Sequence, residues 1–319
     1  MDIYELQPHG VTVIDTGFVR PRFDAAYLVV QDGRAAYIDT GPNSAVPRLL
    51  GALERHGLAP DAVDYVIVTH VHLDHAGGAG LLLQHLPRAR LVVHPRGARH
   101  LVDPTALMQG VRAVYGDEVA ARDYGELVPV PADRVLTTHD GMVLELAGRP
   151  LLVADTPGHA RHHHCIWDAA SRGWFTGDTF GIAYPDLTTG SGRFAFPTTT
   201  PVQFEPEALR ESIERLLARE PQVMYLTHFG ATREVAAHAQ MLRRQLDAMV
   251  RLAQGEAHAP ARSERLREGL RQLYLHELAQ GGCTRPAAEC AALLEGDIEL
   301  NAQGLEVWLD RQTAPKGTA

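Results

Sequence analysis

The stretch 69–78, which reads Thr-His-Val-His-Leu-Asp-His-Ala-Gly-Gly, constrains the fold of this chain more than any other part of the sequence. A β-branched and apolar run at 65–68 precedes it and predicts a short buried strand. The two glycines lead into an apolar segment at 81–83 that predicts a helix. A strand end, a group of imidazoles with a carboxylate, and a helix start together indicate a metal site at the edge of a β-sheet.

The metal-binding side chains of this stretch fall into two pairs. His70 and His72 are two residues apart in chain that we expect to be extended, so both can point in the same direction. Asp74 and His75 follow where the chain turns, and they can point to a second position nearby. The spacing therefore suggests two metal positions, whose remaining ligands must come from elsewhere in the sequence.

The bulk composition is that of a soluble globular protein. The chain has 319 residues, of which 45% are hydrophobic and 22% are charged, so it can bury a full core in one large domain or two modest ones. The formal net charge of −9 argues against a broad nucleic-acid-binding surface. We therefore expect a small-molecule substrate and no nucleic-acid partner.

The sequence also gives an expectation for the compartment. Cys165, Cys283 and Cys290 do not form the pattern of a disulfide framework. The N-terminus lacks the basic and apolar regions of a signal peptide. No apolar run approaches the roughly 20 residues of a transmembrane helix. We expect a cytoplasmic protein without a membrane partner.

Strands and helices alternate in the first part of the chain, which indicates the α/β class. We expect strands at 11–15, 26–30, 35–39, 65–68 and 91–94, and an amphipathic helix at 44–57. Residues 97–134 interrupt this alternation, with helices predicted at 105–114 and 117–123. We read them as an insertion over one edge of the core, and such long excursions often cover active sites.

The remaining sequence predicts a second group of strands and then a helical segment. The strands lie at 142–146, 150–154, 166–168, 173–176 and 223–226, with a long loop at 181–203 and a helix at 205–219. Helices follow at 232–254, 261–280, 286–295 and 298–311. We therefore predict a catalytic domain at 1–230 and a helical C-terminal extension, 231–319, packed on it.

Further candidate ligands follow the ends of predicted strands. His159, Asp178 and His228 each come within a few residues of the end of a short apolar run, as Asp39 does earlier in the chain. In an α/β sandwich such strand ends converge on one edge. With the first stretch they supply enough ligands for two metal ions and a bridging water. The full set is His70, His72, Asp74, His75, His159, Asp178 and His228.

This ordered set, preceded by Asp39-Thr40-Gly41, resembles the metallo-β-lactamase superfamily over residues 10–230. The resemblance implies a four-layer αββα sandwich, in which two β-sheets are flanked by helices. It also divides the ligands between two ions, with His70, His72 and His159 on the first, Asp74, His75 and His228 on the second, and Asp178 bridging both.

The resemblance implies a hydrolase. A hydroxide bridging two divalent ions would attack a small ester, thioester or lactone, and Asp74 or a metal-bound water would handle the proton of the leaving group. The ligand types favour zinc, with iron or manganese as alternatives. Asp39 precedes a Thr-Gly turn, and we expect it to orient a ligand rather than to bind metal.

Three further residues are candidates for the neighbourhood of the substrate. His163 lies four residues after His159, where members similar to glyoxalase II often carry a second histidine. Tyr184 and Phe194 lie in the loop that follows Asp178, where they could line a pocket or serve as ordinary packing.

Two alternatives to a hydrolase remain at this level. Persulfide dioxygenases share these motifs and use one iron, and a non-catalytic binding protein could use the same fold. Glyoxalase II resembles the chain in Asp178 and in its helical extension, but its glutathione-binding pattern is not recognisable in 232–311. The nearest resemblance is to uncharacterised hydrolases that share the segment Thr-Pro-Gly-His-Ala-Arg-His-His at 156–163.

The apolar face of the helix at 232–254 could serve a homodimer, with packing on the core as the alternative.

Overall fold

The computed structural model describes residues 2–190, 192–199 and 202–313, and it separates into two compact units. Unit 1 comprises Met1–Thr156, His162–Gly177 and Glu220–Arg233. Unit 2 comprises Pro157–Arg161, Asp178–Arg219 and Glu234–Ala319. This division differs from the predicted boundary at residue 230, because the segment that follows Asp178 clusters with the C-terminal helices.

The first sheet of unit 1 has seven strands in the order β1 to β7. The first four strands are antiparallel neighbours, and β4 to β7 are parallel to one another. The strands are β1 (Tyr4–Gln7), β2 (Val11–Asp15), β3 (Ala25–Gln31), β4 (Arg34–Ile38), β5 (Val63–Ile67), β6 (Arg90–Val93) and β7 (Val135–Thr137).

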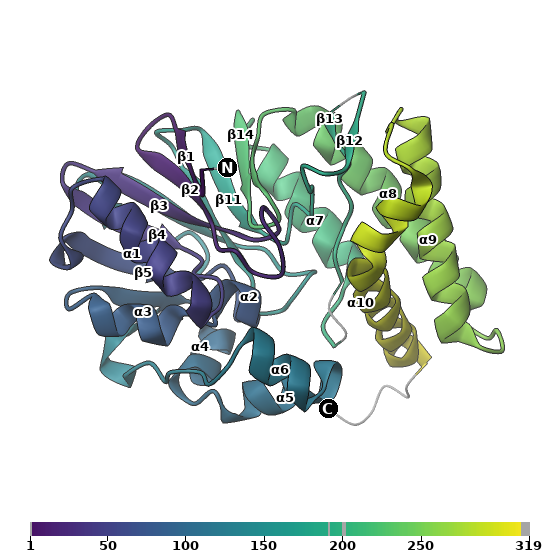
Figure 1. Cartoon of the computed structure of the whole chain (residues 1–319), viewed down its shortest axis with the longest axis horizontal. Coiled ribbons are helices and arrows are strands. Elements are labelled where there is room, and N and C mark those ends of the chain that lie inside the picture. Colours follow the sequence, from purple (N-terminus) through teal and green to yellow (C-terminus); the bar gives the residue numbers. More distant parts are fainter. Residues whose placement is uncertain (1, 191, 200–201, 314–319) are drawn as a thin grey trace. The chain divides into compact units, whose positions relative to one another are not determined.

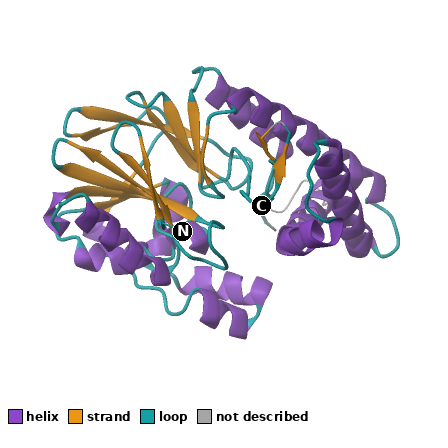
Figure 2. Cartoon of the chain, turned by 45° about the horizontal axis from the view of Figure 1, so that its top comes forward, coloured by secondary structure: helices purple, strands orange, loops and turns teal. Residues whose placement is uncertain are grey.

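The second sheet of unit 1 has six strands in the order β15-β14-β11-β10-β9-β8. Only β11 and β14 are parallel neighbours in it. Its strands are β8 (Val143–Leu146), β9 (Arg149–Asp155), β10 (His164–Asp168), β11 (Gly173–Gly177), β14 (Val223–Leu226) and β15 (Gly230–Thr232). Figure 2 shows both sheets in orange.

The main core of unit 1 lies between the two sheets. Tyr27 from the first sheet packs with Ile166 and Phe175 from the second, and all three are buried. Helices cover the other face of the first sheet, where Leu49 and Leu82 belong to a second apolar cluster (Figure 1). The helices of unit 1 are α1 (Val46–Arg55), α2 (Leu73–Ala76), α3 (Ala79–His85), α4 (Pro95–Val102), α5 (Thr105–Tyr115) and α6 (Asp117–Asp123), with 3₁₀ turns at Asn43–Ala45, Pro60–Ala62 and Ala132–Arg134.

The predicted insertion contains both expected helices, α5 and α6, within one or two residues of their predicted bounds. The helix α4 was not predicted. It begins at Pro95, where a proline suits the first helical turn, and the His94 ring accepts a hydrogen bond from the backbone N–H of Arg96. The insertion docks closely on α3, since a Cβ atom at Gly80 would lie 1.8 Å from the carbonyl oxygen of Val128.

Unit 2 is mainly helical, and its three long helices α8, α9 and α10 pack against one another (Figure 1). The prediction of two helices at 286–295 and 298–311 is wrong, because α10 is continuous. Gly296 does not end it, since Leu294, Ile298 and Leu305 are buried along one face on either side of that glycine. The elements of unit 2 are β12 (Thr188–Thr189), β13 (Gly192–Arg193), α7 (Pro206–Leu217), α8 (Val235–Glu256), α9 (Arg262–Gln280) and α10 (Ala287–Thr313).

The apolar face of α8 is covered within the chain, because Leu242, Leu246 and Met249 are at most 1% exposed. A homodimer would have to use another surface. None of the helices in the described part of the chain is long and apolar enough to cross a membrane. The predicted α/β class, with two sheets, flanking helices and a helical C-terminal segment, is confirmed.

Candidate metal centre

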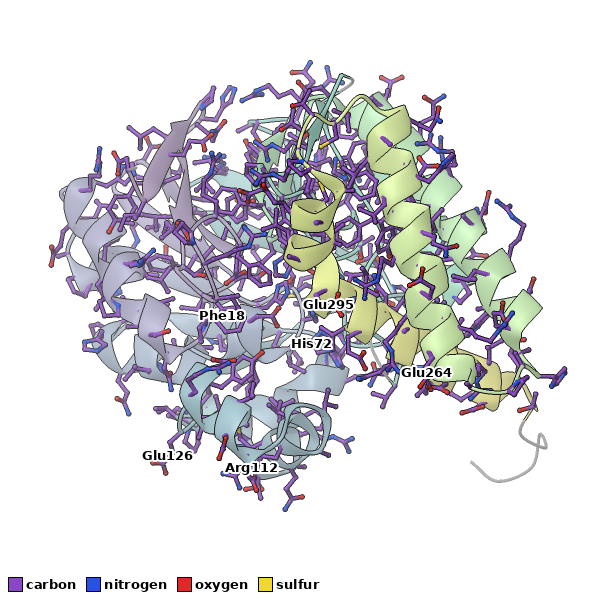
Figure 3. The ribbon with its side chains drawn as sticks, turned by 45° about the vertical axis from the view of Figure 1, so that its right-hand side comes forward. Phe18, His72, Arg112, Glu126, Glu264 and Glu295 are labelled. Atoms are coloured by element: carbon purple, nitrogen blue, oxygen red, sulfur yellow. The ribbon has the colours of Figure 1, made fainter. Side chains whose placement is uncertain are left out.

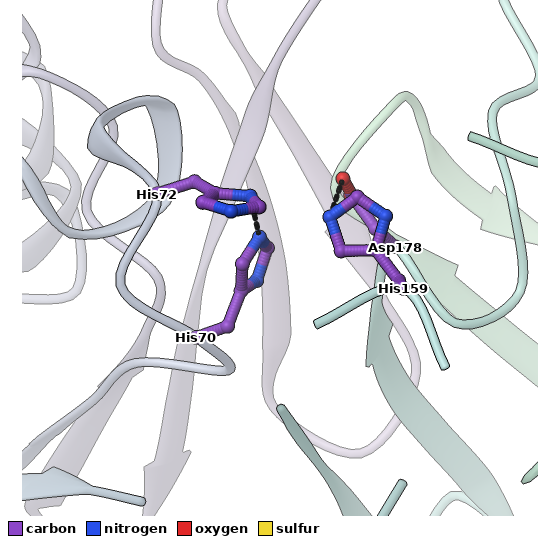
Figure 4. A group of neighbouring side chains, drawn as sticks. All are labelled: His70, His72, His159 and Asp178. Atoms are coloured by element: carbon purple, nitrogen blue, oxygen red, sulfur yellow. Dashed lines mark hydrogen bonds and ion pairs between the residues drawn. The ribbon is translucent and has the colours of Figure 1, made fainter. Parts of the chain in front are cut away.

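The end of β5 brings the first two predicted ligands together within unit 1. His70 lies in the extended segment after the strand, and His72 is the residue that precedes the short helix α2. The Nε2 atom of His70 lies 2.7 Å from Nδ1 of His72. The two imidazoles therefore face each other through these nitrogen atoms (Figure 4).

A second group, also within unit 1, combines α2 with the segment after β14. Asp74 Oδ2 lies 3.6 Å from Nε2 of His75 and 3.4 Å from Nε2 of His228. One ligand atom from each of these three residues lies within 4.8 Å of the other two. The group could hold a metal ion, and its members are the three residues that the family resemblance assigns to the second ion.

The remaining two predicted ligands form a pair within unit 2. His159 Nε2 lies 3.2 Å from Asp178 Oδ2, and both residues are at most 5% exposed. Figure 4 draws this pair and the His70–His72 pair, with a dashed line inside each.

In four of these histidines a neighbouring group contacts Nδ1, the ring nitrogen that does not face the other candidate ligands. This arrangement is typical of metal-binding histidines, because a partner at one nitrogen fixes the tautomer and the ring orientation. The contacts are His70 Nδ1 to Thr69 Oγ1 at 3.2 Å, His75 Nδ1 to Asp39 Oδ2 at 2.9 Å, His159 Nδ1 to the Thr198 carbonyl oxygen at 3.1 Å, and His228 Nδ1 to the Phe23 carbonyl oxygen at 2.9 Å.

Asp39 is the residue that ties these elements together in unit 1. It follows β4 with a φ of +56°, a left-handed conformation that aspartate tolerates better than most residues. Its carboxylate accepts hydrogen bonds from the backbone N–H and the hydroxyl of Thr69 and from the hydroxyl of Thr227. It also contacts Nδ1 of His75, and its role in orienting a metal ligand stays a prediction.

The ring of His163 packs against the ring of His70. Its ring is fully buried, and its centroid lies 4.8 Å from that of His70 at an interplanar angle of 29°. Its Nδ1 atom lies 3.0 Å from the Thr156 hydroxyl. His163 therefore supports the ring of His70, and a substrate contact stays a prediction.

Tyr184 and Phe194 lie in unit 2 and are at most 1% exposed. The Tyr184 hydroxyl donates to Asp297 Oδ1 at 3.2 Å. The ring of Phe194 stacks on that of Phe196, with 5.6 Å between centroids. Both residues pack within unit 2, and their predicted place in a substrate pocket stays a prediction. Part of the loop that carries them, residues 191, 200 and 201, lies outside the described residues.

Asp24 is a residue of this region that sequence reasoning missed. Its carboxylate is fully buried and accepts a hydrogen bond from the Thr16 hydroxyl at 2.7 Å. Burial raises the pKa of Asp24 to about 7, while the charges of His228 and His75 act in the opposite direction. A single aspartate before an apolar strand gave no spacing signal by which it could have been found.

An apolar cluster adjoins α2. Leu73, which lies between His72 and Asp74, packs with Phe18 from the segment after β2 and with Tyr124 and Leu127 of the insertion. Arg112 and Glu126, both labelled in Figure 3, belong to the same insertion. The Arg112 side chain is 58% exposed. The insertion therefore packs against the helix that carries two of the predicted ligands.

Comparison with solved structures shows the fold. The chain is similar to the archaeal metallo-beta-lactamase superfamily protein ST1585 from Sulfolobus tokodaii, with a TM-score of 0.66, 24% identity, and coverage of 94% of this chain and 99% of that one. It is also similar to the metallo-beta-lactamase family protein TTHA1429 from Thermus thermophilus, with a TM-score of 0.65, 22% identity, and coverage of 98% and 97%.

Sequence comparison points the same way. The chain is 29% identical over 226 residues to the ST1585 protein of Sulfurisphaera tokodaii. The matched region covers 69% of this chain and 78% of that protein. It is 30% identical over 193 residues to a hydroxyacylglutathione hydrolase of Xanthomonas campestris, and there it spans only 55% of the relative's length. A family model described as the metallo-beta-lactamase superfamily matches residues 19–228, which include all seven predicted ligands. With its two sheets and its His and Asp clusters that could hold metal, the chain belongs to the metallo-β-lactamase superfamily.

Proposed function

We propose that this chain is a dinuclear metal-dependent hydrolase that cleaves a small ester, thioester or lactone. The observation that carries the proposal is the way the candidate ligand atoms face one another. His228 donates from Nδ1 to the Phe23 carbonyl, so the neutral form of the ring has its lone pair at Nε2. That atom faces Asp74 Oδ2 at 3.4 Å. A lone pair and a carboxylate oxygen repel each other unless a proton or a metal cation lies between them.

The same opposition occurs at two other rings. His75 contacts Asp39 through Nδ1, and its Nε2 atom lies 3.6 Å from Asp74 Oδ2. His159 contacts a backbone carbonyl through Nδ1, and its Nε2 atom lies 3.2 Å from Asp178 Oδ2. One divalent cation in each group would offset this repulsion without protonating several buried rings at once. The residues present therefore fit metal ions.

Under this proposal each residue has a stated role. Two divalent ions, with zinc as the first candidate, would supply Lewis acidity and lower the pKa of a coordinated water. His70, His72 and His159 would hold the first ion, Asp74, His75 and His228 would hold the second, and Asp178 would contribute to both.

The chain's own groups would then position the reaction and move its protons. Asp39 fixes the ring of His75, and Thr69 and Thr227 fix Asp39 in turn. The Asp74 side chain is 23% exposed, so its carboxylate can take up a proton and give it to the leaving group. The similarity to a hydroxyacylglutathione hydrolase supports an acyl thioester as one member of the substrate class.

Asp178→Asn is the variant that tests the proposal. It removes one carboxylate charge and the ability to share two ions, so we expect the metal content to fall from two ions per chain toward one and hydrolysis of a panel of esters, thioesters and lactones to fall at least 100-fold. Asp32→Asn is the matched control, because Asp32 lies in the turn between β3 and β4 and should change neither quantity.

Three results would contradict the proposal. Hydrolysis at the unmodified rate in Asp178→Asn would remove the shared carboxylate from the mechanism. One iron per chain, with oxygen uptake on a persulfide and no hydrolysis, would instead identify a sulfur dioxygenase. Metal binding without turnover of any substrate in the panel would favour a binding protein.

A further inference from the structure

A backbone segment of unit 2, residues 197–199, fixes the orientation of His159. The Thr198 carbonyl oxygen lies 3.1 Å from His159 Nδ1. Because a carbonyl oxygen only accepts, the proton of the ring must be on Nδ1, and Nε2 keeps the lone pair that a metal ion requires. The position of this one carbonyl therefore decides which nitrogen His159 presents to a metal.

The side chain of Asn301, on α10, holds this segment on both sides of Thr198. Its Oδ1 atom accepts a hydrogen bond from the backbone N–H of Thr199 at 2.7 Å. Its Nδ2 atom donates to the Pro197 carbonyl at 3.3 Å and to the Tyr274 hydroxyl at 2.9 Å. The Thr199 hydroxyl adds a contact of 3.2 Å to the carbonyl oxygen of Asn301. The peptide units that flank Thr198 are thus tied to the C-terminal helix, and its own carbonyl is left to face His159.

The position of Asn301 in the helix is one that packing alone would give to an apolar residue. It lies on the same buried face of α10 as Ile298 and Leu305, and it is 1% exposed. Burying an amide is unfavourable unless its hydrogen bonds are made. Here both polar atoms of the side chain are bonded, and two of their three partners belong to the segment that contacts His159.

We propose that Asn301 is a positioning residue for the metal ligand His159, acting through the backbone of residues 197–199. This gives the C-terminal helices a role in the metal site, since all the residues of this connection belong to unit 2. The inference rests on the proposed function, because it requires His159 to bind metal.

Asn301→Leu tests the inference, because leucine keeps the volume and loses all three side-chain hydrogen bonds. Residues around a ligand typically change metal affinity by about 10–100-fold. Asn301 does not contact His159 itself but holds the backbone that does, so the effect should be at the low end of this range. We expect the ion bound by His159 to bind about 10-fold more weakly. The ion assigned to Asp74, His75 and His228 should keep its affinity. Asn301→Asp retains an acceptor for the Thr199 N–H and should show a smaller loss.

Leu305→Ala is the matched control on the same helix. Leu305 is fully buried and has no polar side-chain atom, so its truncation destabilises unit 2 without removing a hydrogen bond to residues 197–199. His159→Ala gives the effect of losing the ligand itself. For all variants, Zn²⁺ affinities would be measured by competition with a chromophoric chelator, Co²⁺ spectra would be recorded, and the thermal midpoint would be measured on metal-free protein.

The results separate the inference from the proposed function. Selective weakening of one ion with an altered Co²⁺ spectrum in Asn301→Leu, but not in Leu305→Ala, supports a positioning role. Unchanged affinities in both Asn301 variants, or equal weakening of both ions in Asn301→Leu and Leu305→Ala, would overturn it. If His159→Ala binds two ions as tightly as the unmodified chain, the ligand assignment in the proposed function is itself wrong.

Discussion

The Oδ2 atom of Asp39 lies 2.9 Å from Nδ1 of His75, and both side chains are at most 1% exposed. This contact makes Nδ1 the donor of the ring and leaves Nε2 facing Asp74. A buried carboxylate therefore sets the tautomer of one ligand of the candidate metal centre.

The variant Asp39→Asn should weaken metal binding with little loss of packing. The new amide can still accept from the Thr69 N–H through Oδ1, but it presents a donor to His75 and so favours the opposite tautomer. We expect about 10–100-fold weaker binding of one ion in a chelator competition. Unchanged binding of both ions would show that the contact does not orient a ligand, and Asp32→Asn is the control for the chemical change.

Gly177→Ala should disturb the segment that leads into Asp178. A Cβ atom there would lie 2.5 Å from His163 Nε2 and 2.6 Å from Thr69 Oγ1, at a φ of +47°. We expect hydrolysis to fall by about 100-fold, because a shift of about 1 Å in a reacting group has effects of that size. The measurement is kcat on a chromogenic ester.

Gly148→Ala separates this steric effect from backbone strain. Gly148 also has a positive φ, +80°, but nothing lies within 4 Å of a Cβ atom built there. Both variants should lose similar amounts of stability from the left-handed backbone, whereas only Gly177→Ala should lose activity. Equal activities in the two variants would count against the steric argument.

Arg149→Leu should be strongly destabilising although it lies outside the candidate metal centre. Arg149 and Asp168 form a buried ion pair at 2.5 Å, with side chains that are 3% and 0% exposed. Burial raises the pKa of Asp168, but the hydrogen bonds from Arg149 and Ser171 outweigh it and hold that pKa below its usual range. Removing the guanidinium leaves a buried charge without its partner and should cost about 3–5 kcal/mol of unfolding free energy.

An exposed pair provides the comparison for this loss. Arg55 and Asp2 approach to 3.0 Å, with side chains 48% and 53% exposed, so Arg55→Leu should change the unfolding free energy by less than about 1 kcal/mol. Urea denaturation measures both variants. A loss in Arg149→Leu no larger than in Arg55→Leu would refute the argument from burial.

His238 predicts a loss of stability in mild acid. Burial lowers the pKa of its ring from 6.5 to about 4, and Nε2 lies 2.9 Å from the Phe180 carbonyl oxygen. Between pH 6.5 and about 4 the unfolded chain binds a proton that the folded chain does not, so the free energy of unfolding falls as the pH falls through this window. Above pH 6.5 the group adds no pH dependence.

His238→Gln should flatten this dependence, because glutamine can donate to the Phe180 carbonyl and does not titrate. Urea denaturation at several pH values within the window compares the two proteins. An identical pH dependence in the variant would exclude His238 as a source of the acid sensitivity.

Local sequence patterns were sufficient for much of the fold. Helices α5, α7 and α9 were predicted nearly to their observed bounds, because apolar spacing and terminal prolines or glycines act over a few residues. The continuity of α10 was not predictable in this way. Gly296 lowers helix propensity locally, and the packing of the residues on both sides of it outweighs that effect.

The sequence by itself determined the candidate ligands, because His and Asp follow the ends of short apolar strands in an order that is specific to one superfamily. Only the tertiary structure decided what holds those ligands. Asn301 lies 102 positions from Thr199, which it contacts, and Asp39 lies 188 positions from Thr227. Such hydrogen bonds leave no periodic trace in a sequence, because they depend on which distant segments the packing brings together.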